Sequence, residues 1–182
     1  MNIELRKFAW YPRLSEETNA FNADVYIDGV RSATASNDGH GGSNMLHDIV
    51  KGTRKRLDEH CKTLPPVPCS FGDGQPLAVD LDFFISLLVE AMIKDQEQKK
   101  QLAKLRRDLT KEIMCTYKDK TGVFAIKLKK PHAVTPESIS KFRSTRPNID
   151  LVLNELPVEV ALKLLTADPE TVGGSNLKAK VV

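Results

Sequence analysis

The glycine-rich stretch between residues 36 and 44 holds the residues best suited to bind a ligand. Three glycines within four positions prevent regular structure there and allow backbone conformations that other residues resist. If a helix follows at once, exposed backbone amides and the helix dipole can bind a phosphate or a carboxylate. The ligand-binding residues predicted in this way are Asn37, Gly39, His40, Gly41, Gly42 and Ser43.

Two interpretations of this loop stay open. The first, which we favour, is a tight connection that needs glycine for its backbone conformation. The second is an anion or nucleotide site in which the glycine and Ser43 amides are joined by the side chains of His40 and Asn37. The residues match neither the dinucleotide fingerprint nor the phosphate loop that ends in Gly-Lys-Ser/Thr, so no particular nucleotide is indicated.

Metal and catalytic chemistry find less support. The imidazole and carboxylate groups that could bind zinc or manganese are those of Asp38, His40, His47 and Asp48. Their spacing matches neither a closed structural zinc site nor the histidine pair of a helical zinc motif. No Gly-x-Ser-x-Gly elbow surrounds a serine. We therefore predict no metal, no cofactor and no catalytic residue, and keep an uncharacterised hydrolase as the third hypothesis.

Composition bounds the class of protein. The chain has 182 residues, 41% apolar and 28% charged, which is typical of a folded chain with a core of its own. The longest apolar run, near residues 83–93, is far short of a membrane span, and no secretion signal follows Met1. Three cysteines without ligand spacing suit a reducing compartment. We expect a soluble, cytoplasmic protein that does not enter the membrane.

Three antiparallel strands are expected before the loop. Alternating apolar and polar residues predict a strand from Phe21 to Ile27, and an earlier one begins at Ile3. Asp28-Gly29 tolerates positive φ at both central turn positions, so a tight hairpin leads into a third strand, residues 30–35.

A helix is expected directly after the loop, capped by Ser43 or Asn44. Its apolar face would consist of Leu46, Ile49, Val50 and Leu57. Prolines and glycines between residues 65 and 74 then predict a linker.

The rest of the chain reads as a helical segment and a small mixed unit. Asp80 and Asp82 suit a helix start, and helical spacing extends to Ile113 in one long helix or two. A strand around residues 124–128, a helix starting at Thr135-Pro136, a strand near 149–153 and a short helix after Pro157 follow. The predicted fold class is α+β, with units at 1–76 and 77–168 and a flexible tail at 169–182.

Basic residues gather in three segments, 51–62, 99–111 and 127–130. If they converged on one surface, they could neutralise several phosphates, which makes a nucleic-acid-binding module the second hypothesis. The net charge of +3 and the interspersed acidic residues favour a solvated helix face instead.

Several stretches of the first 70 residues are recognisable together, namely residues 13–21, Tyr26-Ile27-Asp28-Gly29, residues 37–42 and residues 61–66. They resemble a group of small uncharacterised proteins of bacteria and their phages or plasmids. This resemblance implies a biological context and supplies no activity. The context raises the hypothesis of an accessory, anti-defence protein of a phage or mobile element that binds a host protein or a nucleotide-like ligand. Non-catalytic binding is therefore the preferred function.

Overall fold

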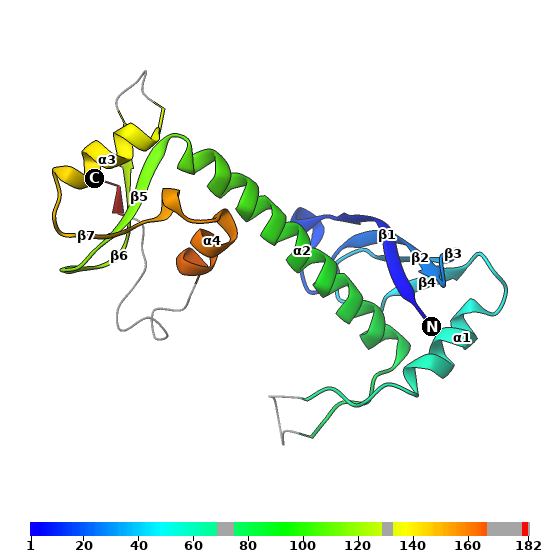
Figure 1. The fold of residues 1–182 in the computed structure, drawn as a ribbon. Coiled ribbons are helices and arrows are strands. Elements are labelled where there is room, and N and C mark those ends of the chain that lie inside the picture. The colour runs from blue at the N-terminus through cyan, green and yellow to red at the C-terminus, as the bar shows by residue number, and fades with distance from the viewer. Residues whose placement is uncertain (69–74, 129–132, 167–179, 182) are drawn as a thin grey trace. The chain divides into compact units, whose positions relative to one another are not determined.

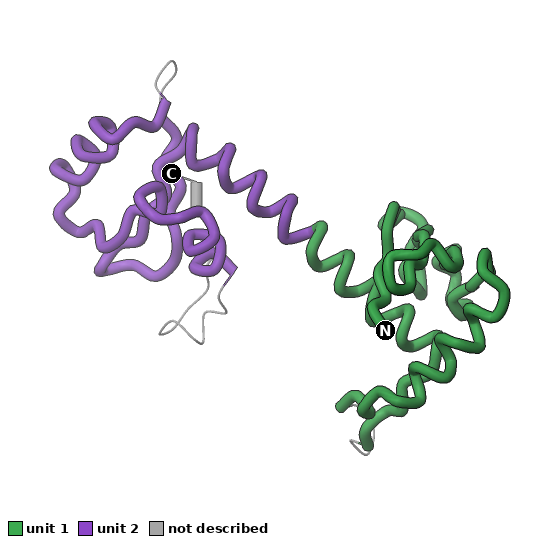
Figure 2. Tube along the Cα trace, turned by 45° about the vertical axis from the view of Figure 1, so that its right-hand side comes forward, with its two compact units in different colours: residues 1–96 green, residues 97–182 purple. Residues whose placement is uncertain are grey.

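The computed structural model describes residues 1–68, 75–128, 133–166 and 180–181. The chain divides into two compact units, Met1–Gln96 and Glu97–Val182, coloured separately in Figure 2. The helix α2, Leu81–Leu109, contributes to both units, so the division falls inside it, whereas the sequence placed a boundary after residue 76. The fold is mixed α+β, as predicted.

The first unit is a four-stranded antiparallel sheet covered by helices (Figure 1). Its strands follow one another in the order β1-β2-β3-β4. The elements of this unit are β1 Ile3–Trp10, the 3₁₀ helix η1 Pro12–Leu14, β2 Phe21–Ile27, β3 Val30–Asn37, β4 Met45–Asp48, α1 Thr53–Cys61 and the first part of α2.

The predicted hairpin is confirmed. β2 and β3 pair in antiparallel register, with Ile27 opposite Val30. Asp28 has φ 51° and Gly29 has φ 83°, the positive values that a two-residue primed turn requires. Alternation then places Phe21, Ala23, Val25 and Ile27 in the core.

The prediction of three strands was wrong, because the segment expected to start a helix forms β4 instead. Leu46 faces Ala35 across the sheet, and residues 45–48 pair with the otherwise open edge of β3. Gly52 has φ 84°, a left-handed conformation that does not continue a helix, and α1 begins only at Thr53. Ile49 and Val50, expected on the helix's apolar face, are half exposed at 50% and 47%.

One face of this sheet carries the core of the unit. α1 contributes Leu57 and Cys61, and the first turns of α2 contribute Leu81, Ile85 and Val89. Asp80 caps α2 through a 2.8 Å hydrogen bond from the Phe83 amide, as its position before the apolar spacing predicts. The helices therefore cover the face that the apolar residues of β2 point to.

The second unit is a smaller sheet with helices on both faces. Its elements are the second part of α2, β5 Glu112–Tyr117, β6 Lys120–Lys127, α3 Pro136–Ser144, β7 Ile149–Val152, the 3₁₀ helix η2 Leu153–Glu155, α4 Val158–Thr166 and β8 Lys180–Val181. The strand order is β7-β5-β6-β8, with β8 parallel to β6. The predicted helix start at Thr135-Pro136 is confirmed, and Thr135 caps α3 with its side chain. Thr135 and Ser138 also form a capping box: the hydroxyl of Thr135 accepts the Ser138 amide at 3.2 Å, and the hydroxyl of Ser138 accepts the Thr135 amide at 2.9 Å.

Two apolar layers explain the alternating strands of this unit. Val123 and Ala125 of β6 pack with α2 and α4, whereas Ile113 and Cys115 of β5 pack with α3. Asn154 joins the end of α2 to β5, because its amide group donates to the carbonyls of Leu109 and Glu112 and accepts the Met114 amide, at 2.8–2.9 Å. α2 accordingly ends at Leu109, and Ile113, expected to continue a helical pattern, lies in a strand.

Most of the predicted tail lies outside the described residues, as does part of the predicted linker at 65–74. Of the described helices, none combines the length and the apolar character that crossing a membrane requires.

Candidate functional site

The glycine-rich loop is fastened to the segment that follows η1. The carbonyl oxygen of Gly39 accepts three backbone amides, from Glu16, Glu17 and Thr18, at 3.0–3.3 Å. Gly39 is buried and has φ 93°, and a Cβ atom at this position would overlap the carbonyl oxygen of Leu14. Glycine is therefore required here for the backbone conformation and for this close approach.

Asn37 organises the loop from within. Its side-chain oxygen accepts the Gly39 amide and the Thr18 hydroxyl, each at 2.8 Å. Its amide group donates to the carbonyl of Gly42 at 2.9 Å and to Oδ1 of Asn44 at 3.3 Å. Only 9% of Asn37 is exposed, so these bonds replace water around a buried polar group.

The loop does not start a helix, so the anion site expected at a helix N-terminus loses its premise. β4 follows the loop, and the amides of Gly39 and Gly41 donate to Oδ1 of Asn37 and Oγ1 of Thr18. The amide of His40 lies 3.2 Å from Oδ1 of Asp38. Three amides of the stretch are thus bonded to side chains of the protein, those of Asn37, Asp38 and Thr18, rather than turned together toward a ligand.

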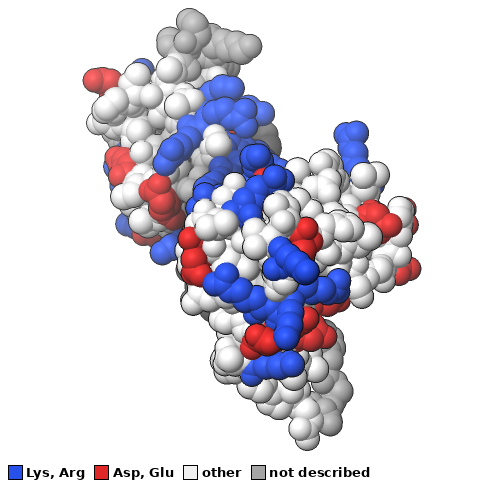
Figure 3. Space-filling model, turned by 90° about the vertical axis from the view of Figure 1, so that its right-hand side faces the viewer, with Lys and Arg blue, Asp and Glu red and all other residues white. Residues whose placement is uncertain are grey.

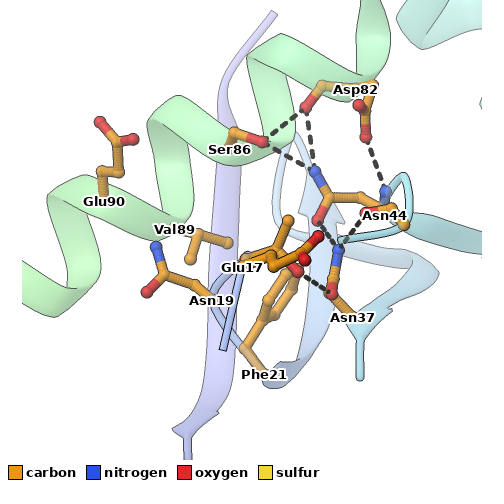
Figure 4. Close-up of a pocket in the computed structure, with 11 residues that line it drawn as sticks. Glu17, Asn19, Phe21, Asn37, Asn44, Asp82, Ser86, Val89 and Glu90 are labelled. Carbon is orange, nitrogen blue, oxygen red and sulfur yellow. Dashed lines mark hydrogen bonds between the residues drawn. The ribbon is translucent and has the colours of Figure 1, made fainter. Parts of the chain in front are cut away.

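A polar pocket of about 230 Å³ lies between the loop and the first turns of α2 (Figure 4). Asn44 connects the two walls: its backbone amide donates to Oδ1 of Asp82 at 2.6 Å, and its side chain donates to the Asp82 carbonyl at 3.0 Å and the Ser86 hydroxyl at 2.9 Å. The lining residues are Glu17, Thr18, Asn19, Phe21, Asn37, Gly42, Asn44, Asp82, Ser86, Val89 and Glu90. Its lining carries carboxylates and neutral amides.

A second hollow, of about 490 Å³, lies between η1 and the loop. Three of its lining side chains are apolar and exposed: Tyr11 at 41%, Leu14 at 55% and Met45 at 57%. The other lining residues are Ala20, Asn22, Ser36, Asn37, Asp38 and His40. We call this hollow the apolar groove.

The predicted site residues are therefore divided among different surfaces. Asn37 and Gly42 line the polar pocket, and Asn37 and His40 line the apolar groove. Gly39 is buried, and Gly41 lies against the Glu17 side chain. Ser43 lines a smaller hollow of about 120 Å³ together with Arg54 and Leu81.

His40 forms an ion pair at the rim of the apolar groove. Its Nδ1 lies 3.1 Å from Oε2 of Glu16, and both side chains are exposed. The hydrogen bond to Glu16, helped by the negative charges of Glu16, Asp38 and Glu17, raises the pKa of His40 above its ordinary value. Because the folded pKa is the higher one, this contact stabilises the loop below the unfolded pKa and is lost as the pH rises through the folded pKa.

Replacing Glu16 by glutamine is expected to lower the pKa of His40, because the charged acceptor of its hydrogen bond disappears. The titration of the His40 ring by NMR measures the shift. Glu59→Gln, which removes an exposed carboxylate from α1, is the control and should leave the His40 titration unchanged. An unchanged midpoint in Glu16→Gln would contradict the pairing.

Charges around the loop are mainly acidic. Among the described residues that line the polar pocket and the apolar groove, none is Lys or Arg, whereas Glu17, Asp38, Asp82 and Glu90 are present. Over the face drawn in Figure 3, bands of basic side chains are interspersed with acidic ones. No group of three or more His, Cys, Asp or Glu in the described part of the chain has the arrangement of a metal site.

No family model, curated protein or solved structure matches the chain. The resemblance of the N-terminal stretches to phage and plasmid proteins therefore stays a prediction, and the candidate function rests on the geometry of the first unit.

Sequence reasoning missed the residues that face the loop. Asp82 and Ser86 are far from Asn44 in the chain and meet it only because α2 packs beside the loop. Tyr11 and Leu14 flank a proline in a connection, where an exposed apolar pair is the available signal.

Proposed function

We propose that this chain is a non-catalytic binding protein that contacts a partner protein through the apolar groove. The observation that carries the proposal is the exposure of Tyr11, Leu14 and Met45 around one hollow. Aromatic residues and methionine are enriched in the buried centres of protein interfaces, and clustered exposed apolar side chains mark interaction sites.

The acidic surroundings favour a protein over a nucleotide. A phosphate group next to Asp38 and the Glu16–His40 pair, or beside Glu17 and Asp82, would meet carboxylates without a lysine or arginine from the lining to neutralise it. The amides of Gly39 and Gly41 already donate to the side chains of Asn37 and Thr18. A protein surface with an apolar centre and basic residues at its rim would be complementary to the apolar groove and to the acidic residues around it.

The resemblance of the first 70 residues supplies the setting of this proposal. An accessory protein of a phage or mobile element acts in the bacterial cytoplasm on factors of its host, and an anti-defence role would make the partner a host protein. Hydrogen bonds that hold the loop in place support such a role: Gly39 joins the loop to the segment that follows η1, and Asn44 joins it to α2.

A photo-crosslinking amino acid at position 14 tests the proposal in a lysate of the host. One stoichiometric protein adduct is expected from position 14 and none from position 30, where Val30 is equally exposed at 59% but lies on the hairpin. With the purified partner, Leu14→Asp should weaken binding by about tenfold or more in calorimetry, because it places a charge at the interface centre.

Val30→Asp is the matched control and should leave the affinity unchanged. Two results would overturn the proposal: a partner whose affinity is indifferent to Leu14→Asp and Met45→Glu, or a nucleotide that raises the unfolding temperature of the wild type while no protein adduct forms.

A further inference from the structure

The charged residues around the apolar groove are mostly acidic. The groove is built mainly from residues 11–20 and 36–45, which contain Arg13 as their one Lys or Arg against Glu16, Glu17 and Asp38. The first unit as a whole is acidic too, with 10 Lys and Arg against 14 Asp and Glu in residues 1–96. Acidic charge next to an apolar surface favours a partner that carries positive charge.

A histidine of the chain itself already lies at this acidic rim. His40 lines the groove, and its Nδ1 lies 3.1 Å from Oε2 of Glu16. Glu17, from the same segment as Glu16, and Asp38, from the loop, are the other carboxylates whose negative charge acts on the ring. A cation that took the place of the ring beside Glu16 would therefore lie next to a side chain that fills the groove.

The pair formed by His40 and Glu16 can be exchanged for another at little cost. The two side chains are 57% and 69% exposed, and an ion pair between exposed side chains contributes little because water solvates both partners. Lysine and arginine keep their charge through the physiological pH range, whereas histidine loses its charge within it. A lysine or arginine of a partner can thus replace His40 at Glu16.

We propose that the apolar groove receives a short basic segment of its partner, in which an apolar side chain lies among Tyr11, Leu14 and Met45 and a neighbouring lysine or arginine displaces His40 from Glu16. The groove volume of about 490 Å³ is within the range of about 300–1,000 Å³ that is usual for sites of small ligands, so it takes a few side chains. This inference rests on the proposed function, because it states which chemistry the groove selects.

Displacement of His40 makes the binding of a basic segment depend on pH. Protonated His40 neutralises Glu16 and repels the cation of the partner, whereas neutral His40 leaves Glu16 free to pair with it. Because Glu16, Asp38 and Glu17 raise the pKa of His40, the affinity is low below that raised pKa and increases as the pH rises through it. By linkage, a bound basic segment lowers the pKa of His40.

A display library of random peptides of about 12 residues, selected on the full chain and counter-selected on Leu14→Asp, tests the inference. Peptides in which Lys or Arg stands beside Leu, Met or Phe should be enriched on the wild type, because the groove and its carboxylates are met together. Fluorescence anisotropy of a labelled, enriched peptide then measures its affinity for each variant.

Glu16→Gln with Asp38→Asn should weaken the binding of such a peptide about 4- to 25-fold, because each exposed charge pair changes the affinity about two- to fivefold. Both substitutions keep the size of the side chain. Asp58→Asn with Glu59→Gln is the matched control, since it removes the same charge from α1, a helix that is described in full and contributes no lining residue. Its affinity should equal that of the wild type.

The pH dependence tests the role of His40. The wild type should bind the peptide about two- to fivefold more tightly above the NMR midpoint of His40 than below it, and His40→Gln should bind equally at both pH values. A pH dependence that persists in His40→Gln would overturn the displacement of this residue.

Three further outcomes overturn the inference: enriched peptides that depend on Leu14 but lack Lys and Arg, equal affinities of the two double variants, and no enrichment that depends on Leu14. The proposed function is decided separately by the photo-crosslink at position 14. A protein adduct there without an enriched basic peptide would leave the groove as a binding site and refute only the chemistry inferred for its partner.

Discussion

Replacing Gly39 by alanine is expected to lower the free energy of unfolding of the first unit by about 2–5 kcal/mol. Two costs add. The backbone has φ 93°, a conformation that costs an L-residue about 1–2 kcal/mol. The new methyl group would also overlap the Leu14 carbonyl oxygen, and this overlap adds about 1–3 kcal/mol of strain. A backbone shift that relieved the strain would disturb the three hydrogen bonds that the Gly39 carbonyl accepts.

Two other glycines separate these costs. Gly29 has φ 83° with no atom within 4 Å of an added Cβ, so Gly29→Ala should cost only the backbone term of about 1–2 kcal/mol. Gly42 has open space and no positive φ, and Gly42→Ala should stay within about 0.5 kcal/mol of the wild type.

Urea unfolding followed by tryptophan fluorescence is the appropriate measurement, because Trp10, the only tryptophan, lies in β1 and reports on the first unit. If Gly39→Ala proved no more destabilising than Gly29→Ala, the close approach of the loop to η1 would be wrong.

The part of the fold that could be predicted is the part fixed by neighbours in sequence. The hairpin follows from the alternation of β2 and from Asp28-Gly29, and the start of α3 follows from Thr135 and Pro136. Each depends on groups within a few residues of one another, where turn and cap chemistry act without the rest of the protein.

β4 could not be predicted in this way, because its pairing is decided by an open sheet edge. Leu46, Ile49 and Val50 have the spacing of a helix face, and a short apolar run of this kind is ambiguous by period alone. Leu46 enters the core from β4, while the amides of Ile49 and Val50 both donate to the carbonyl of Ser32 at 2.9 Å. Backbone groups of β3 thus outweigh the local pattern.

The same limit applies to the candidate site. The sequence drew attention to the glycine-rich stretch, but the chemistry assigned to it depended on a helix that begins only at Thr53. The loop was predicted to bind an anion, but the carboxylates of Glu16, Glu17 and Asp82 around it disfavour a negatively charged ligand. Such long-range neighbours decide which ligand a loop can accept, and they are invisible to motif matching.

Asn37→Ala is expected to lower the free energy of unfolding by about 2–4 kcal/mol, because it leaves one buried and two part-buried polar groups without this partner, at about 1–3 kcal/mol for a buried group and less for the others. The amide of Gly39, the hydroxyl of Thr18 and the carbonyl of Gly42 all lose their bond to the same side chain. Asn37→Asp keeps both accepted bonds and loses the donated ones, so it should be less damaging than alanine at neutral pH.

Asn19→Ala provides the control for Asn37→Ala, since Asn19 lines the same polar pocket at its half-exposed margin and should change stability by no more than about 0.5 kcal/mol. Urea unfolding with Trp10 fluorescence measures all three variants on one scale. An order in which alanine and aspartate at position 37 destabilise equally would mean that the donated bonds, to Gly42 and Asn44, hold the loop. We expect alanine to be more destabilising than aspartate, because the side-chain oxygen of Asn37 accepts the Gly39 amide at 2.8 Å. That bond holds Gly39 where its carbonyl accepts the amides of the segment that follows η1.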